Sequence, residues 1–196
     1  FALEGLKKTM GEKDGGNKVR LDWTILHEIR AFLTCPLLDM LMPKITMLGN
    51  SGASGSWQQV GCSAQRNTGS TGLLCWQVLH GGSGRQCIPE ASDCRPRPCW
   101  LDQSVPLLIA VPNDYSFPSG HTLASVIGAT ILTAADRRFG LIAIPLAILI
   151  AFSRLYLYVH FPSDILGAVI LGLGIGALTL CGGNWAEKWL YAHKGF

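Results

Sequence analysis

The sequence lacks the patterns that mark several common classes of protein. Its seven cysteines form no CxxC pair and no histidine lies at zinc-ligand spacing, so we predict no metal site. Charged residues make up only 15% of the chain, and the net charge of +3 comes mostly from the N-terminal segment. A nucleic-acid binder more often has a basic stripe with interleaved aromatics, so we predict no nucleic-acid partner. The N-terminus has no apolar core of a signal peptide, so membrane insertion would depend on internal segments.

Apolar residues are abundant but unevenly placed. They make up 48% of the chain, with a mean hydropathy of +0.29, and they concentrate after residue 105. Three candidate membrane spans follow, at residues 121–135, 139–158 and 165–181. Each taken alone also fits a buried helix of a soluble protein, but three in succession favour membrane spans.

The third candidate span is rich in glycine, which lets helices approach closely. Its glycines are Gly167, Gly172, Gly174 and Gly176. Arg137 and Arg138 lie between the first two spans, and lysines follow the third. The positive-inside rule places both of these segments in the cytoplasm, so the segments around Ser119 and His160 face the other side of the membrane.

The first half of the chain has a different composition. Residues 1–20 form a polar tail, and residues 21–50 form two amphipathic helices, interrupted at Pro36, that we expect at the membrane interface. Residues 51–94 are rich in Gly, Ser and Cys without any helical or strand period. Residues 95–181 form the core with its three spans, and residues 182–196 form a cytoplasmic tail. We predict an all-α, multi-pass transmembrane bundle that is truncated or disrupted in its first half.

Two short stretches carry residues suited to phosphate chemistry. In Pro118-Ser119-Gly120-His121, Ser119 is placed to cap a helix whose first N–H groups form an anion site, and Gly120 permits close approach of a ligand. The stretch taken alone also fits an ordinary capped helix.

The second stretch runs from Ser153 to Asp164. Arg154 precedes His160 by about two helical turns, and its guanidinium suits phosphate. Asp164 is close enough to His160 in sequence to orient its imidazole, which leaves the other ring nitrogen free to attack. An interfacial histidine and a snorkelling arginine are the plain alternatives. Ionisable residues gathered on one side of a membrane favour a functional site.

These stretches resemble the phosphatidic acid phosphatase type 2 superfamily, whose pattern is K-x6-R-P, P-S-G-H and S-R-x5-H-x3-D. The second part matches at residues 118–121, and the third matches at every specified position of residues 153–164. The resemblance is close over residues 95–181 and weaker over residues 21–50.

The resemblance implies roles for individual residues and implies no metal or cofactor. His160 is the nucleophile that forms a phosphohistidine, Asp164 orients it, and His121 is the general acid and base. The phosphoryl oxygens are bound by the remaining motif residues, which are Arg97, Ser119, Gly120 and Arg154.

The first part of the pattern is only half present. Arg97-Pro98 fits its end, but Glu90 stands where the family has a phosphate-binding lysine. If the codons of residues 85–94 are read from their second base, a Lys or Arg must stand in place of Glu90. The shifted peptide can then contain K-x6-R-P in register with Arg97-Pro98. One hypothesis is therefore out-of-frame translation from about residue 53 to residue 94. The other is a genuine extracytoplasmic insert with disulfides among its cysteines.

We therefore predict a lipid phosphatase of the cell membrane with its site on the extracytoplasmic face. Its substrate is a lipid phosphate or diphosphate such as undecaprenyl diphosphate or phosphatidic acid, and the sequence leaves the choice and the oligomeric state open. One alternative is an inactive membrane remnant, because Glu90 places a negative charge beside the phosphate. A vanadate-dependent haloperoxidase is a further alternative, disfavoured because those relatives are soluble.

Overall fold

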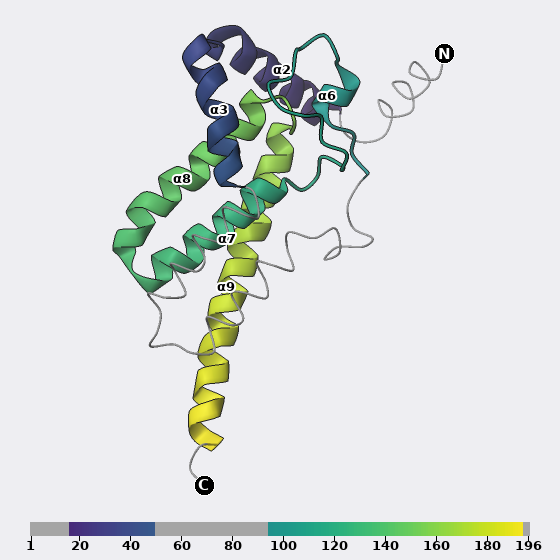
Figure 1. Cartoon of the computed structure of the whole chain (residues 1–196). Helices are drawn as coiled ribbons and strands as arrows, with labels where there is room; N and C mark the ends of the chain where they lie inside the picture. Colours follow the sequence, from purple (N-terminus) through teal and green to yellow (C-terminus); the bar gives the residue numbers. More distant parts are fainter. Residues whose placement is uncertain (1–15, 50–93, 194–196) are drawn as a thin grey trace.

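A computed structural model describes residues 16–49 and 94–193 of the chain. These residues form six helices and no strand: α2 (Gly16–Leu33), α3 (Pro36–Leu48), α6 (Pro98–Leu101), α7 (Gly120–Ala135), α8 (Arg137–Tyr156) and α9 (Pro162–His193). In Figure 1, α7 and α8 form an antiparallel pair, and α9 runs along α7 and continues beyond it. The helices α2, α3 and α6 gather at the end of the bundle where α8 stops and α9 begins.

The N-terminal helices begin and break at identifiable residues. Helix α2 begins at Gly16, inside the segment assigned above to a polar tail. It ends at Leu33, and Pro36 then opens α3, where its fixed φ suits the first turn. Residues 50–93, including Glu90 and most of the proposed out-of-frame segment, lie outside the described residues.

Two of the three predicted spans are long and apolar enough to cross a membrane. They are Arg137–Tyr156 and Pro162–Gly182, whereas the apolar helix α7 has only 16 residues. A bilayer core requires about 20 helical residues, so α7 is short for a full crossing.

The ends of the last two helices differ from the sequence-based prediction. Helix α8 ends at Tyr156 because Tyr158 has a φ of 61°, a left-handed conformation that a helix does not contain. Helix α9 runs on to His193, through the segment predicted as a tail. The glycines inside α9 do not end it. Each costs about 1 kcal/mol of helix stability relative to alanine, and a long helix that is already nucleated tolerates this cost.

Glycines bring the three long helices together. A Cβ added at Gly172 would lie 2.9 Å from Cβ of Val126, and one at Gly176 would lie 2.9 Å from Cβ of Thr130. These two glycines are one helical turn apart on α9, so α7 packs against a stripe that carries no side chains. Gly140 of α8 meets Thr133 of α7 in the same way.

The outer surfaces of α8 and α9 are strongly apolar. Large side chains that are more than half exposed include Leu141, Ile142, Ile148, Leu166, Ile170, Leu173 and Leu178. Such a continuous apolar surface is unusual on a protein surrounded by water and suits lipid.

The buried apolar cluster lies at the junction of α8 and α9. Its members come from α2, α3, α6, the end of α8 and the turn after α8, and they are Leu26, Met42, Cys99, Tyr156, Leu157, Tyr158, Val159 and Phe161. This cluster encloses the backbone around His160 and fixes the place of the candidate site.

Candidate active site

His160 lies in the turn between α8 and α9 and is 1% exposed. Its Nδ1 is 2.7 Å from the carbonyl oxygen of Ser116, and its Nε2 is 3.0 Å from Nη1 of Arg97. A guanidinium can only donate hydrogen bonds, so Nε2 accepts from Arg97 and carries no proton. Nδ1–H therefore donates to the Ser116 carbonyl, and the lone pair of Nε2 is directed toward Arg97.

The surroundings of His160 keep the ring neutral. Burial lowers the pKa of His160 well below its usual value, and the positive charges of Arg97 and Arg154 lower the pKa further. A neutral imidazole with Nε2 unprotonated is the form that can act as a nucleophile.

The turn that carries His160 has a strained backbone. Tyr158 is fully buried with its φ of 61°, a conformation that costs a non-glycine residue on the order of 1–3 kcal/mol. Its hydroxyl donates to Oδ2 of Asp102 at 3.1 Å and lies 3.3 Å from Nε2 of His27. Burial, followed by this hydrogen bond, raises the pKa of Tyr158, so the hydroxyl keeps the proton that it donates.

Arg97 is buried and fully engaged. Its Nε donates to the carbonyl oxygen of Asp114 and its Nη2 to Oδ1 of Asp114, both at 2.8 Å. Its Nη1 donates to the carbonyl oxygen of Val159 at 2.8 Å, besides facing His160. The guanidinium is thereby fixed at the open nitrogen of the histidine.

Asp164 lies close to His160 but does not form a hydrogen bond to its ring. Its Oδ2 is 3.9 Å from Nδ1 of His160, beyond hydrogen-bonding distance. The carboxylate instead accepts from Oγ of Ser116, from N–H of Phe161 at 2.9 Å, and from Nη1 of Arg95 at 2.7 Å. The sequence-based expectation of a carboxylate bonded to the imidazole is therefore replaced by a contact through Ser116.

Arg154 and His121 both lie near the C-terminal end of α3. Nη1 of Arg154 donates to Oγ1 of Thr46 at 2.9 Å, and its buried Nε has no hydrogen-bond partner among the described residues. A Cβ added at Gly49 would lie 3.0 Å from Cδ2 of His121. The absence of a side chain at Gly49 thus makes room for the His121 ring.

Ser119 and Gly120 begin α7. Ser119 is the N-cap residue and is fully buried, but its Oγ accepts from Oγ1 of Thr122 at 3.1 Å instead of capping the first turn. Gly120 is exposed, and a Cβ there would meet nothing within 4 Å. The helix start therefore has open space in front of it, as an anion site requires.

Three residues of this arrangement escaped the sequence analysis as site residues. Ser116 and Arg95 stood beside the recognised motifs without a role. Asp22 lay in the first predicted amphipathic helix, also without a role. Arg95-Pro96 repeats the Arg-Pro of the first motif, but no spacing rule gave any of the three residues a role, because their contacts join segments far apart in the sequence.

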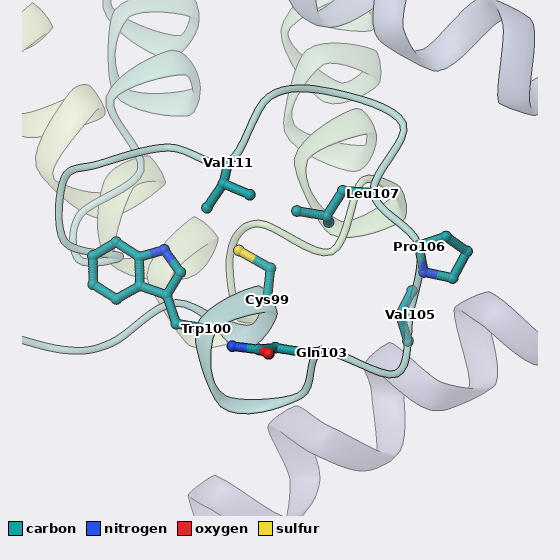
Figure 2. A pocket seen from close by; sticks show the side chains of 7 residues that line it. All are labelled: Cys99, Trp100, Gln103, Val105, Pro106, Leu107 and Val111. Carbon is teal, nitrogen blue, oxygen red and sulfur yellow. The ribbon is translucent and has the colours of Figure 1, made fainter.

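An apolar cavity of about 410 Å³ lies beside the site. Figure 2 shows its lining, which comes from α6 and the loop after it: Cys99, Trp100, Gln103, Val105, Pro106, Leu107 and Val111. Cys99 is two residues from Arg97, and burial raises the pKa of its thiol, so the sulfur remains protonated. Among the described cysteines, Cys94 and Cys99 are free thiols. Cys62, Cys75 and Cys87 of the proposed insert lie outside the described residues.

Comparison with known proteins identifies the family. The family model of the PAP2 superfamily matches residues 91–188, half of the chain. The chain belongs to the PAP2 superfamily. The matched segment contains α6, α7, α8 and most of α9, and with them all the predicted catalytic and phosphate-binding residues.

Two curated proteins are similar to part of the chain. An undecaprenyl-diphosphatase of Sulfolobus acidocaldarius is 39% identical over 75 residues, which cover 38% of this chain and 36% of that protein. The undecaprenyl-diphosphatase BcrC of Bacillus subtilis is 32% identical over 83 residues, which cover 42% of each. The chain therefore matches less than half the length of these relatives.

Solved PAP2-type structures share the fold. A transmembrane PAP2 type phosphatidylglycerolphosphate phosphatase from Bacillus subtilis has a TM-score of 0.70 at 25% identity, over 95% of both chains. Aquifex aeolicus LpxE has a TM-score of 0.64 at 24% identity, over 82% of this chain and 94% of that one. The prediction of an all-α fold of the PAP2 membrane phosphatase type is confirmed.

Proposed function

We propose that the chain is a lipid phosphatase that hydrolyses a phosphomonoester or diphosphate of a membrane lipid through a phosphohistidine on His160. The observation that carries the proposal is the tautomer of His160, whose Nδ1–H is donated to Ser116 while Nε2 is unprotonated beside Arg97. Membership of the PAP2 superfamily supports the reaction class.

The reaction proceeds in two displacements. Nε2 of His160 attacks phosphorus, and the bond from phosphorus to the leaving oxygen breaks as His121 protonates that oxygen. Water then attacks the phosphohistidine, His121 accepts a proton from the water, the P–N bond breaks, and inorganic phosphate leaves. Asp164 stabilises the positive charge that develops on the ring through Ser116.

The phosphoryl oxygens bind among cations and helix N–H groups. Arg97 moves its Nη1 hydrogen bond from Nε2 to a phosphoryl oxygen when the substrate enters. Arg154 donates a hydrogen bond to a phosphoryl oxygen from its unpartnered Nε. Ser119 and the N–H of Gly120 bind phosphoryl oxygens at the start of α7. Donors placed in this way stabilise the charge of the transition state.

We place the site at the extracytoplasmic face of the cell membrane in a multi-pass protein. Arg137 and Arg138 begin α8 and His160 follows its end, so about 30 Å of helix separates the basic residues from the nucleophile. The positive-inside rule puts the arginines in the cytoplasm and His160 on the other side. Isoprenyl diphosphates are the first substrates to test, because both similar sequences are undecaprenyl-diphosphatases.

The test is phosphate release from undecaprenyl diphosphate and phosphatidic acid by the full chain in detergent. We expect release by the wild type, and a loss of more than about a thousandfold in His160→Ala, because the covalent step is removed. His27→Ala is the matched control, since His27 is an exposed histidine of α2 that lies 3.3 Å from the Tyr158 hydroxyl and has no role in the proposed chemistry. Alkaline quenching of labelled substrate should trap phosphohistidine in the wild type and in His27→Ala, and not in His160→Ala.

The inactive remnant is the competing outcome. It rests on Glu90, which replaces the lysine of the family pattern. A folded wild-type chain that releases no phosphate would support the remnant, and Glu90→Lys should then restore activity.

A further inference from the structure

A network of charged residues extends behind His160, and Arg95 is at its centre. Nη1 of Arg95 donates to Oδ1 of Asp164 at 2.7 Å and to Oγ of Ser163 at 2.6 Å, while Nη2 donates to Oδ2 of Asp22 at 2.7 Å. Its Cζ lies 4.1 Å from the centre of the Phe161 ring, a cation–π contact. Both terminal nitrogens and one face of the guanidinium are thus held.

Asp22 attaches α2 to this network. Its Oδ1 accepts from N–H of Ser163 at 3.0 Å, and its Oδ2 accepts from Oγ of Ser163 at 2.6 Å. Ser163 lies in the first turn of α9, where N–H groups lack partners within the helix and a negative charge is favourable. Asp22 therefore caps α9 from another helix while anchoring Arg95.

Ser116 connects the network to the histidine. Its N–H donates to the carbonyl oxygen of Arg95 at 2.9 Å, its Oγ donates to Asp164, and its carbonyl oxygen accepts from Nδ1 of His160 at 2.7 Å. Arg95 therefore controls Ser116 in two ways, directly through its backbone and indirectly through Asp164. All three polar groups of Ser116 are used, and the residue is fully buried.

We propose that Arg95, anchored by Asp22, is a positioning residue that fixes Asp164 and Ser116, so that they hold His160 with Nδ1 protonated and Nε2 open to phosphorus. The inference rests on the proposed role of His160 as the nucleophile. Among the described residues, the Arg95 side chain donates to Asp22, Ser163 and Asp164 and not to Nε2 of His160. It therefore acts through other residues and not on the substrate.

Charge balance explains why the residue must be cationic. The Asp164 side chain is completely buried, and Arg95 is its cationic partner. The Arg95 side chain is 22% exposed, but its removal would leave the buried carboxylate without this cation, which is unfavourable. Asp164 would then be pulled away from Ser116, and the acceptor of Nδ1–H would lose its fixed position.

The kinetic test compares the full-length wild type with Arg95→Gln, Arg95→Lys and Asp22→Asn, using farnesyl diphosphate in detergent. We expect Arg95→Gln to lower kcat about a hundredfold with KM within about twofold of wild type, because the lost contact orients a catalytic group and does not bind substrate. Arg95→Lys should recover kcat to within about tenfold, because an ammonium still pairs with Asp164. Asp22→Asn should lower kcat about fivefold.

A second measurement reports the ring itself. Nitrogen-15 spectra of histidine-labelled chain, assigned with His160→Gln, should show a ring protonated at Nδ1 in the wild type and a mixture of tautomers in Arg95→Gln. If Arg95→Gln does not fold, Arg95→Lys and Asp22→Asn decide the question with the same two readouts. Wild-type kcat and an unchanged tautomer in both of these variants would overturn the proposal.

Two further outcomes would also overturn it. A rise in KM at constant kcat in Arg95→Gln would make Arg95 a substrate ligand. Equal losses in Arg95→Lys and Arg95→Gln, with lower thermal stability and an unchanged tautomer, would make its role purely structural. A wild type that releases no phosphate would refute the proposed function alone, because the tautomer measurement needs no turnover.

Discussion

Two regions of the molecule are stabilised by opposite kinds of interaction. The polar end buries Asp22, Arg97, Ser116, Arg154, His160 and Asp164 and partly buries Arg95, and most of their polar atoms have a protein partner. The apolar body, formed by the middle of α7, α8 and α9, packs glycine against side chains and exposes large aliphatic residues outward. The polar end is thus specified by hydrogen-bond geometry, whereas the body is specified by shape and by the surrounding lipid.

This difference predicts how each region responds to substitution. A change at the polar end should lower the activity of chain that stays folded, because each donor has a defined target. A change in the body should lower stability and leave the turnover of the folded fraction unchanged. Variants of the two regions can test that separation.

The largest effect in this comparison, after loss of the nucleophile itself, is expected at Arg97. A lysine there cannot reach the Asp114 carbonyl, the Asp114 carboxylate and the Val159 carbonyl together, which the guanidinium does at 2.8 Å each. We expect Arg97→Lys to lower kcat/KM for farnesyl diphosphate by about a hundredfold to a thousandfold. The measurement is steady-state phosphate release, with thermal stability recorded in parallel.

Arg138→Lys is the control for Arg97→Lys, because Arg138 is an exposed arginine at the start of α8, and His160 follows the other end of this helix. It should leave kcat/KM unchanged. Wild-type kinetics in Arg97→Lys would show that the hydrogen bonds of the Arg97 guanidinium are dispensable. The proposed difference between the two regions would then be wrong for the residue where we expect it to be clearest.

The two regions also differ in how far the sequence alone predicts them. Hydropathy predicted α8 and the apolar part of α9, because a lipid-facing helix reveals itself within one continuous segment. It missed the stop at Tyr156, since nothing local in the sequence shows that Tyr158 adopts a left-handed conformation. Helix boundaries set by tertiary packing are not encoded in composition.

At the polar end, the motif resemblance supplied His160, Asp164 and Arg97 but not the residues that connect them. Asp22 contacts Ser163, which is 141 positions away. A partnership of this kind follows from the packing of α2 against the start of α9, and no spacing rule in a single sequence predicts it. Ser116 was missed for a related reason, because it serves His160 through its backbone carbonyl, which every residue type has.

A smaller effect, confined to stability, is expected in the body at Gly172. A Cβ there would lie 2.9 Å from Cβ of Val126 and 3.3 Å from the carbonyl oxygen of Leu123, so a larger residue must push α7 and α9 apart. We expect Gly172→Val to destabilise the fold by about 1–3 kcal/mol, the usual cost of overpacking, with kcat of the folded fraction within about twofold of wild type. Thermal unfolding in detergent measures the loss of stability. Turnover normalised to the concentration of active sites measures kcat of the folded fraction.

Gly174 provides the matched control for Gly172 on the same helix. A Cβ at Gly174 meets nothing within 4 Å, so Gly174→Val adds the same side chain without overpacking. Equal destabilisation by the two variants would show that helix propensity, and not the approach of α7 to α9, is what Gly172 provides.

The smallest effect concerns the response of the polar end to acid. Because burial and two arginines lower the pKa of His160 in the folded chain, the ring stays neutral while its unfolded counterpart takes up a proton below about pH 6.5. The unfolded chain then binds more protons, so the stability contributed by neutral His160 is complete above about pH 6.5 and declines as the pH falls. Between pH 7.5 and pH 5.5 the decline should reach about 1 kcal/mol.

His160→Gln removes this contribution, so the thermal midpoint of the wild type should fall more steeply with acid than that of the variant. Parallel curves for the two proteins would mean that folding does not lower the pKa of His160, which is incompatible with a buried ring whose Nε2 accepts from Arg97.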